Sequence, residues 1–248
     1  TKAALGSPAI ADALLRAGVS SLGDSRIDNL ETLRRARVQA SMKLIRCPMM
    51  SEVARVVQHA DVSFNSELGV IRQLSLAAKA AGVVHGVMLM VELGDLREGI
   101  MPADLERSVR ETLRQPNILL AGIGANLACR SGVIPNAKNM GELSTLADTI
   151  DASFDLVLGT VSGGNSGNLR WALSGVDTGR INDLRLGEAI LLGRDPLDRQ
   201  AIHGLHVDAF TLIAEVIESK VKPTVPWGEV GQGAFREIPL AVDRGLVR

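Results

Sequence analysis

Short apolar runs alternate with amphipathic helical stretches along most of this 248-residue chain, and this alternation constrains the fold more than any other feature. Strands that alternate with helices indicate βαβ units and a parallel sheet. We interpret eight runs as strands, beginning near Thr1, Ser20, Lys43, Val62, Gly86, Leu119, Asp155 and Asp183. A repeat of roughly 30 residues is typical of right-handed βαβ units, so the pattern predicts an α/β fold, a (β/α)8 TIM-type barrel. An open doubly wound sheet is the alternative if the count is wrong by one or two strands.

Helical patterns fill the intervals between these runs. Ser7 precedes Pro8 at a first helical position, and Gly18 and Gly82 stand where helices should end. We expect helices at Pro8–Ala17, Ile27–Arg37, Met50–His59, Glu67–Ala80, Pro102–Arg114, Ala137–Ile150 and Ser166–Leu173.

The rhythm changes after Gly193. Arg194-Asp195-Pro196 predicts a turn, and apolar and polar residues then alternate from Phe210 to Val221 as in a strand. We therefore expect a barrel over residues 1–203 and the first part of an all-β domain over 204–248. The chain also begins without Met inside an expected strand and stops soon after another strand pattern begins, so we expect a fragment that lacks both termini.

Composition excludes several functional classes. The 27 basic and 28 acidic residues are scattered and leave a net charge of −1, which provides no basic footprint for nucleic acid or an anionic membrane. The longest apolar run, Gly86 to Val91, is too short to span a bilayer. Two distant cysteines, Cys47 and Cys129, indicate a reduced, cytoplasmic protein. The four histidines lack metal-site spacing, and we expect His59 and His85 to be solvated.

Lys2 closes the first expected strand. In β/α barrels the C-terminal ends of the strands carry the chemistry, and an amine buried there becomes nucleophilic. A lysine beside a strand end is more often a solvated surface residue, so this position alone proves nothing.

A glycine-rich segment, VSGGNSG (161–167), follows the seventh expected strand and precedes a helix. Consecutive glycines let backbone N–H groups converge on an anion, and barrels frequently hold phosphate in the loops after strands 7 and 8. Ser166 is a natural helix cap or phosphate contact. An ordinary flexible turn is the alternative.

Arg185 lies inside the eighth expected strand, which is otherwise apolar. A charged group there is unfavourable unless it is paired or faces a cavity, so we expect Arg185 to meet an acceptor at the site. A pyridine nitrogen would qualify. The alternative is an ion pair with Asp183 or Glu188. Gly187 would let a phosphate or a ring approach the backbone closely.

Charged and glycine residues also end the fifth and sixth expected strands. Arg97 could hold a phenolate or a carboxylate through two N–H groups, or it could be solvated. The sixth strand ends in GIGANLAC (122–129), which is not a dinucleotide fingerprint. Cys129 is more simply a small apolar residue than a nucleophile.

Taken together, five motifs resemble the fold-type III racemases that depend on pyridoxal 5'-phosphate (PLP), and most closely the alanine/ornithine racemase branch. The motifs are TKA (1–3), VELGDLREG (91–99), GIGANLAC (122–129), SGGNS (162–166) and LRLGEAILLG (184–193). The similarity continues into residues 209–232. It implies an enzyme, an isomerase that interconverts L- and D-amino acids of ornithine or alanine type.

The resemblance also implies roles for individual residues. Lys2 matches the lysine that binds the cofactor and takes the Cα proton on one face, and Arg185 matches the arginine at the pyridine nitrogen. Asn165, Ser166 and Gly187 match the phosphate site. Arg97 matches the arginine near the phenolic oxygen. Asn126 replaces a histidine of the alanine racemase branch.

The resemblance further implies a homodimer whose active site is shared between subunits, with a small amino acid as the substrate. The family typically takes its second base, a tyrosine, from the partner subunit, and this chain contains no tyrosine. The alternatives are a non-catalytic PLP homeostasis protein of the same barrel fold, and a fold-type III decarboxylase or aldolase. Decarboxylases place an acid where Arg185 stands, and aldolases need a metal site. Asp95, Glu98 or Glu188 could hold the distal ammonium of an ornithine-like substrate.

Overall fold

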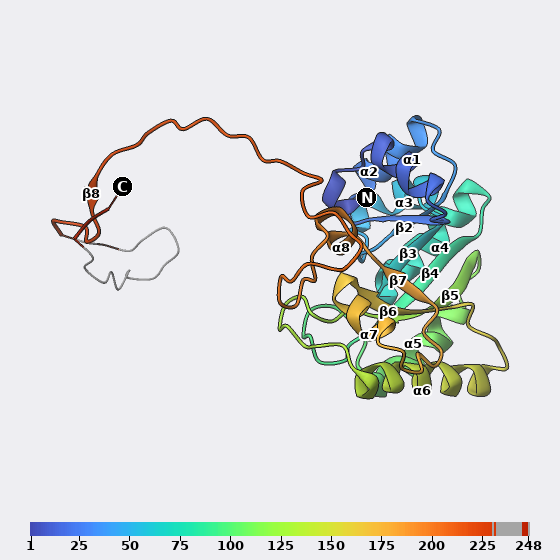
Figure 1. Cartoon of the computed structure of the whole chain (residues 1–248). Helices are drawn as coiled ribbons and strands as arrows, with labels where there is room; N and C mark the ends of the chain where they lie inside the picture. The colour runs from blue at the N-terminus through green and yellow to red at the C-terminus, as the bar shows by residue number, and fades with distance from the viewer. Residues whose placement is uncertain (230, 232–244, 248) are drawn as a thin grey trace. The chain divides into compact units, whose positions relative to one another are not determined.

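Seven parallel strands form one sheet in which strand order follows chain order (Figure 1). The computed structural model describes residues 1–229, 231 and 245–247. Each strand pairs with the next, from β1 with β2 through β6 with β7. The strands are β1 (Ser21–Asp24), β2 (Ser41–Leu44), β3 (Val62–Asn65), β4 (His85–Val91), β5 (Ile118–Ala125), β6 (Thr160–Asn165) and β7 (Asp183–Arg185).

Helices connect the strands and cover the outside of the sheet (Figure 1). The α-helices are α1 (Pro8–Arg16), α2 (Ile27–Arg35), α3 (Val53–His59), α4 (Leu68–Ala81), α5 (Pro102–Leu113), α6 (Ala137–Phe154), α7 (Leu169–Leu173) and α8 (Glu188–Leu192). Three short 3-10 helices are η1 (Lys2–Ala4), η2 (Met50–Glu52) and η3 (Ser166–Asn168). The arrangement confirms the predicted TIM-type barrel, with seven strands instead of eight.

The first expected strand, at Thr1, does not form in the described residues. Lys2–Ala4 form the single turn η1, and within the described residues no ladder joins β7 to β1. Thr1 itself lies against β1: its amino nitrogen donates to the Gly23 carbonyl at 2.8 Å, and its hydroxyl donates to Asp24 at 2.9 Å.

Side chains alternate between two cores. Met42 and Leu44 of β2 belong to the large core between the strands and the helices, whereas Phe64, Met88 and Met90 pack together inside the barrel. Every residue of β4 is buried, as expected for a strand covered on both faces.

Local sequence explains where several elements begin and end. Asn136 caps α6 by accepting the backbone N–H groups of Lys138 and Asn139. Gly82 ends α4 with φ of 67°, a left-handed conformation that favours glycine. Gly122 is required because a Cβ there would collide with the carbonyl oxygen of Thr160, where β5 lies against β6.

One expected strand was placed wrongly, and another begins where expected, at Asp183, but is shorter than predicted. Asp155, predicted to start a strand, ends α6 in the left-handed conformation, and β6 begins five residues later at Thr160. The run LRLGEAILLG (184–193) contains only the last residues of β7, followed by α8. An apolar run of good helix formers reads equally as a buried strand, and here the helix forms.

The expectation that His85 is solvated is also wrong. It opens β4 and is only 1% exposed, with its Nε2 2.8 Å from the Ser63 hydroxyl. Burial lowers the pKa of His85 to about 4. His59 is half-buried at the end of α3, and burial lowers its pKa as well.

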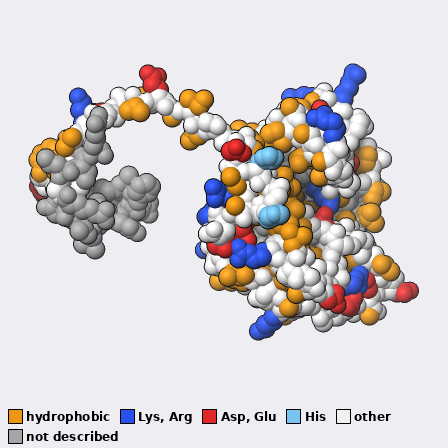
Figure 2. All heavy atoms as spheres, viewed as in Figure 1, with side chains coloured by type: hydrophobic (Ala, Val, Ile, Leu, Met, Phe, Trp, Pro, Cys, Tyr) orange, Lys and Arg blue, Asp and Glu red, His pale blue; other side chains and the backbone are white. Residues whose placement is uncertain are grey.

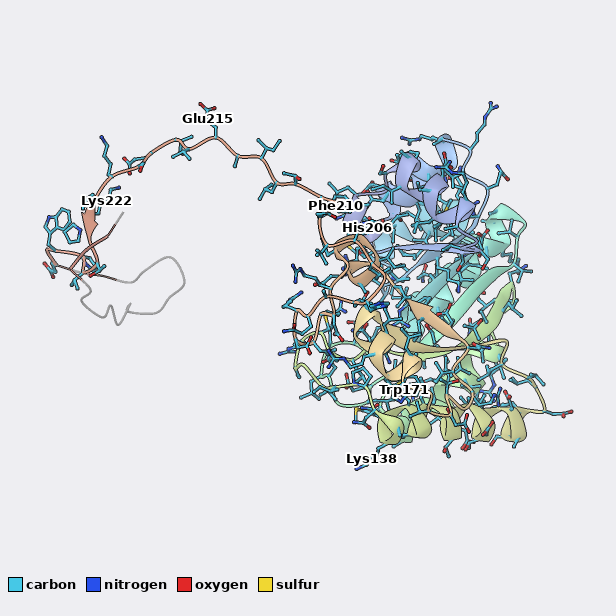
Figure 3. The ribbon with its side chains drawn as sticks, in the orientation of Figure 1. Lys138, Trp171, His206, Phe210, Glu215 and Lys222 are labelled. Carbon is cyan, nitrogen blue, oxygen red and sulfur yellow. The ribbon has the colours of Figure 1, made fainter. Side chains whose placement is uncertain are left out.

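Contacts divide the chain into two units, Thr1–Phe210 and Thr211–Arg248. Phe210 to Val221, expected as a strand, contains neither helix nor strand, as the ribbon around Phe210 and Glu215 shows in Figure 3. Its apolar side chains are exposed, Leu212 to 95%. In the second unit β8 (Lys222–Pro223) pairs antiparallel with β9 (Leu246–Val247). Residues 230, 232–244 and 248 of the expected β domain lie outside the described residues, so that domain stays a prediction.

The surface and the helices add two observations. On the barrel face shown in Figure 2, cationic and anionic side chains are interspersed without a stripe of one sign. None of the helices in the described part of the chain is both long and apolar enough to cross a bilayer.

Candidate active site

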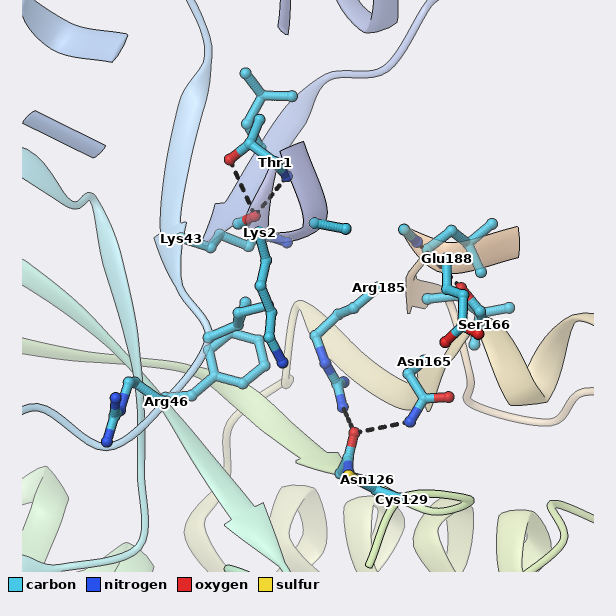
Figure 4. A pocket seen from close by; sticks show the side chains of 18 of the residues that line it. Thr1, Lys2, Lys43, Arg46, Asn126, Cys129, Asn165, Ser166, Arg185 and Glu188 are labelled. Atoms are coloured by element: carbon cyan, nitrogen blue, oxygen red, sulfur yellow. Dashed lines mark hydrogen bonds between the residues drawn. The ribbon is translucent and has the colours of Figure 1, made fainter. Parts of the chain in front are cut away.

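A cavity of about 540 Å³ opens among the C-terminal ends of the strands of the first unit. All seven residues singled out in the sequence line it: Lys2, Arg97, Asn126, Asn165, Ser166, Arg185 and Gly187. Figure 4 shows how Lys2 and Arg185 extend from different segments toward the same space. The fold thus joins residues that are far apart in the sequence.

Lys2 reaches the cavity from η1, not from a strand end as predicted. The residue is exposed, and no hydrogen bond of its Nζ is found among the described residues. The preceding residue is anchored: Thr1 binds Asp24, whose carboxylate also accepts from the Arg26 N–H and the Asn29 amide. The segment that carries Lys2 is therefore held to β1 while its amine stays free.

Arg185, at the end of β7, is tightly held. Its Nη1 donates to the Ser162 hydroxyl at 2.5 Å, and its Nη2 donates to the Ala125 carbonyl at 2.7 Å. The guanidinium lies 5.3 Å from the centre of the Phe64 ring. Burial lowers the pKa of Arg185 to about 10, although Asp183 and Glu98 oppose that shift. Arg185 stays charged at neutral pH, and these contacts leave its Nε for an acceptor in the cavity.

Two asparagines continue the network from Arg185. The Asn126 side-chain oxygen accepts from Arg185 Nη2 at 3.4 Å and from Asn165 Nδ2 at 3.1 Å (Figure 4). Asn165 Nδ2 also donates to the Leu127 carbonyl. The Nδ2 atom of Asn126 is buried without a partner. A buried donor that lacks a partner is unfavourable, so this atom suits a ligand with an acceptor.

Ser166 follows β6 and is buried at the cavity wall. Its hydroxyl accepts from the backbone N–H groups of Gly187 and Ala189, each at 3.1 Å. A Cβ added at Gly187 would meet nothing within 4 Å, so the glycine leaves the cavity open at this point. Ser166 and Gly187 together form a polar cradle between β6 and α8.

The glycines of SGGNS (162–166) serve a different purpose from the predicted anion nest. They lie inside β6 and not in a loop after it. A Cβ on Gly163 would come within 2.7 Å of Ile181, and one on Gly164 would collide with the Asn168 side chain. These glycines therefore permit close packing, and only Asn165 and Ser166 reach the cavity.

Arg97 follows β4 and is partly exposed. Its Nε pairs with Glu98 at 2.8 Å, and its Nη1 donates to the Cys129 sulfur at 3.4 Å. Of the three carboxylates considered for substrate recognition, Glu98 and Glu188 line the cavity. Asp95 does not: burial opposes its ionisation, but the backbone N–H groups of residues 129–131 hold its pKa below the ordinary value. Asp95 is a structural residue.

Sequence reasoning missed Lys43, Asp183 and Arg46 as cavity residues. Strand periodicity could have found Lys43, because Met42 and Leu44 on either side of it face the helices. Lys43 must then face the barrel interior. The alternative considered for Arg185, an ion pair with Asp183 or Glu188, does not form: Asp183 pairs with Lys43, and Glu188 pairs with Arg199.

The cavity is cationic. Five cationic side chains line it against three anionic ones, counting described residues only: Lys2, Lys43, Arg46, Arg97 and Arg185 against Glu98, Asp183 and Glu188. This excess favours an anionic ligand. No cluster of three or more metal-ligating His, Cys, Asp or Glu side chains occurs in the described part of the chain.

Comparison with known proteins identifies the fold and its relatives. The chain is 42% identical over 229 residues to the ornithine racemase of Acetoanaerobium sticklandii, covering 92% of this chain and 64% of that protein. It is 35% identical over 246 residues to the lysine racemase of Thermotoga maritima, covering 99% of this chain and 69% of that one. The chain therefore spans about two thirds of the length of each curated relative.

Among solved structures, PipY of Synechococcus elongatus PCC7942 with PLP bound superposes with a TM-score of 0.62 and 18% identity. The superposition covers 73% of this chain and 85% of PipY. At this identity the similarity shows the fold alone. The sequence profile described as "Alanine racemase, N-terminal domain" matches residues 1–195, which is most of the barrel. The chain therefore belongs to the alanine racemase N-terminal domain family.

Proposed function

We propose that this chain is the PLP-binding barrel of a racemase that interconverts the L- and D-forms of a small basic amino acid. The observation that carries the proposal is the convergence of Lys2, Arg185 and Ser166 on one cationic cavity. The relatives named as ornithine and lysine racemases support the reaction and the basic side chain of the substrate.

The residues present fit PLP. The orphaned Nδ2 of Asn126 and the unused Nε of Arg185 are donors that need acceptors. The cradle of Ser166 and Gly187 offers room and polar groups for the phosphate. Lys2 supplies the amine that would bind the aldehyde. Arg97, which lines the same cavity, would bind the phenolic oxygen.

PLP, when bound, acts as an electron sink that acidifies the Cα–H bond of the amino acid. Lys2 would take the Cα proton on its own face and return one there. Arg185 would donate a hydrogen bond to the pyridine nitrogen without protonating it, because a guanidinium holds its proton tightly. An unprotonated pyridine nitrogen would limit the delocalisation of negative charge from Cα into the ring, which disfavours side reactions such as transamination.

For the substrate's distal ammonium, we propose Glu98 or Glu188, because the third carboxylate that lines the cavity, Asp183, is already bound to Lys43 and Ser162. Each already pairs with an arginine, Arg97 and Arg199 respectively, and would share its charge with the substrate.

We also propose a homodimer, which size-exclusion chromatography with light scattering would test. A cytoplasmic location is supported by two cysteines that form no disulfide.

The experiment is a racemisation assay with PLP on L-ornithine, L-lysine and L-alanine, followed by chiral chromatography. The proposal expects D-ornithine or D-lysine to form faster than D-alanine. Bound PLP without formation of any D-amino acid would instead indicate the PLP homeostasis protein.

A further inference from the structure

An ion pair between Lys43 and Asp183 crosses the interior of the barrel. Lys43 lies in β2 and Asp183 in β7, strands that are not neighbours in the sheet. The distance from Nζ to Oδ1 is 3.1 Å, and the side chains are 16% and 20% exposed. Removing two charges from water is unfavourable unless further contacts compensate, so we expect this pair to have further contacts.

The second oxygen of Asp183 leads to Arg185. Oδ2 accepts the hydroxyl hydrogen of Ser162, which is fully buried. A serine hydroxyl has one hydrogen, so once it is donated to Asp183 the oxygen faces Arg185 as an acceptor. Arg185 Nη1 donates to it at 2.5 Å. Lys43, Asp183, Ser162 and Arg185 therefore form a single directional chain of hydrogen bonds.

The same chain balances charge. Arg185 and Lys43 are both cations at the cavity, and Asp183 is the anion that contacts one directly and the other through Ser162. The remaining charged side chains that line the cavity belong to other segments: Lys2, Arg46, Arg97, Glu98 and Glu188. Among these described residues, none forms a hydrogen bond with Lys43 or Asp183.

We propose that Asp183, which pairs with Lys43, is a positioning residue for Arg185: its carboxylate sets the direction of the Ser162 hydroxyl and thereby aims the guanidinium. The inference rests on the proposed function, in which Arg185 meets the pyridine nitrogen. A guanidinium that is no longer aimed allows that nitrogen to be protonated, and transamination then competes with racemisation.

Asp183→Asn tests the chain directly. The Lys43 ammonium attracts the oxygen of the new amide, so the amide NH₂ turns toward Ser162. The Ser162 hydroxyl then accepts a hydrogen bond from the amide and loses its fixed orientation toward Arg185. We expect about a tenfold rise in keto acid formed per substrate inverted. Lys43→Met leaves Asp183 bound to Ser162 and should change this ratio by less than about threefold.

The double variant Lys43→Met/Asp183→Asn should restore the low keto acid ratio that Asp183→Asn alone loses. Without Lys43 the amide is free to turn its oxygen toward Ser162, and the ratio should return to within about threefold of the wild-type value. Thermal unfolding of the cofactor-free proteins gives a second readout: the two single changes should be non-additive, because each strands one buried charge. Asp28→Asn, which weakens an exposed pair with Arg55 outside the cavity, is the matched control and should leave the ratio unchanged.

Two results would overturn the inference in distinguishable ways. If wild-type protein binds PLP and racemises while Asp183→Asn keeps the wild-type keto acid ratio, the positioning role is wrong and the proposed function stands. If wild-type protein binds no PLP, the proposed function and this inference fail together.

Discussion

The two sides of the cavity are built differently. On one side Arg185 is bound to Ser162, Ala125 and Asn126, and the network extends to Asn165. On the other side Lys2 stands on a single turn of 3-10 helix, exposed and without a hydrogen bond from its Nζ to any described residue. The first side is anchored in strands β5, β6 and β7, whereas the second is bound to β1 through the hydrogen bonds of Thr1 to Gly23 and Asp24.

The difference separates orientation from reaction. A group that orients a ligand acts best when its own contacts fix it before the ligand arrives. An amine that must bond to an aldehyde, release it and carry a proton needs freedom to move. Substitutions on the Arg185 side should therefore impair stability and activity together, whereas a substitution at Lys2 should impair activity alone.

Lys2→Ala should have the largest effect. We expect racemisation to fall by about 10³-fold or more, because both the covalent anchor and one base are lost. The melting temperature should stay within about one degree, because the exposed side chain makes no stabilising contact. Racemisation assays and thermal melts of cofactor-free protein measure the two quantities. A large loss of stability would contradict the proposed difference between the two sides of the cavity.

Arg185→Met should reduce activity and stability together. The change leaves the Ser162 hydroxyl and the Ala125 carbonyl without a donor in a buried setting, which should lower the free energy of unfolding by about 3 kcal/mol. Activity should fall by about 100-fold because the donor proposed for the pyridine nitrogen is lost. Urea unfolding and steady-state kinetics test this pair of values; unchanged stability would show that the network does not hold the protein together.

His85 sharpens the comparison because it is buried in the barrel wall and outside the cavity. Its pKa is about 4 in the folded protein, against 6.5 ordinarily, so the unfolded chain binds a proton first as pH falls. Stability is therefore complete above pH 6.5 and declines toward pH 4, by on the order of 3 kcal/mol. His85→Gln should flatten this part of the profile in urea unfolding at several pH values. An equally steep decline in the variant would assign the effect to other groups.

Asn165→Ala should have the smallest effect. It removes the cap on Gly167 and the bonds to Asn126 and Leu127, and we expect unfolding to become easier by about 1–2 kcal/mol. Activity should fall only a few-fold, because Arg185 keeps its bonds to Ser162 and Ala125. A stability loss as large as that of Arg185→Met would show that the asparagines, and not the arginine, organise this side.

The architecture was readable from the sequence because hydrophobic periodicity reports burial directly. Seven of the seven expected helices occur within a few residues of their predicted bounds, including Pro8–Arg16 and Leu68–Ala81. The seven residues expected at the site also meet in one cavity, since strand ends of a barrel converge.

The failures have physical causes. LRLGEAILLG (184–193) is apolar enough for a strand, but Ser166, distant in sequence, binds the N–H groups that open α8. SGGNS (162–166) has the composition of a phosphate loop, yet its glycines serve packing against Ile181 and Asn168. His85 shows no sequence signal of its partner Ser63. Each of these depends on a tertiary contact that local patterns do not contain.

The central claim is that Lys2 is the residue that binds the cofactor, and one measurement tests it most directly. Protein incubated with PLP is reduced with borohydride, digested and mapped by mass spectrometry, beside the Lys2→Ala variant. The account predicts a reduced pyridoxyl adduct on Lys2, a bound-cofactor absorbance band that reduction removes, and neither in the variant. An adduct on Lys43 instead, or an undiminished band in Lys2→Ala, would contradict it.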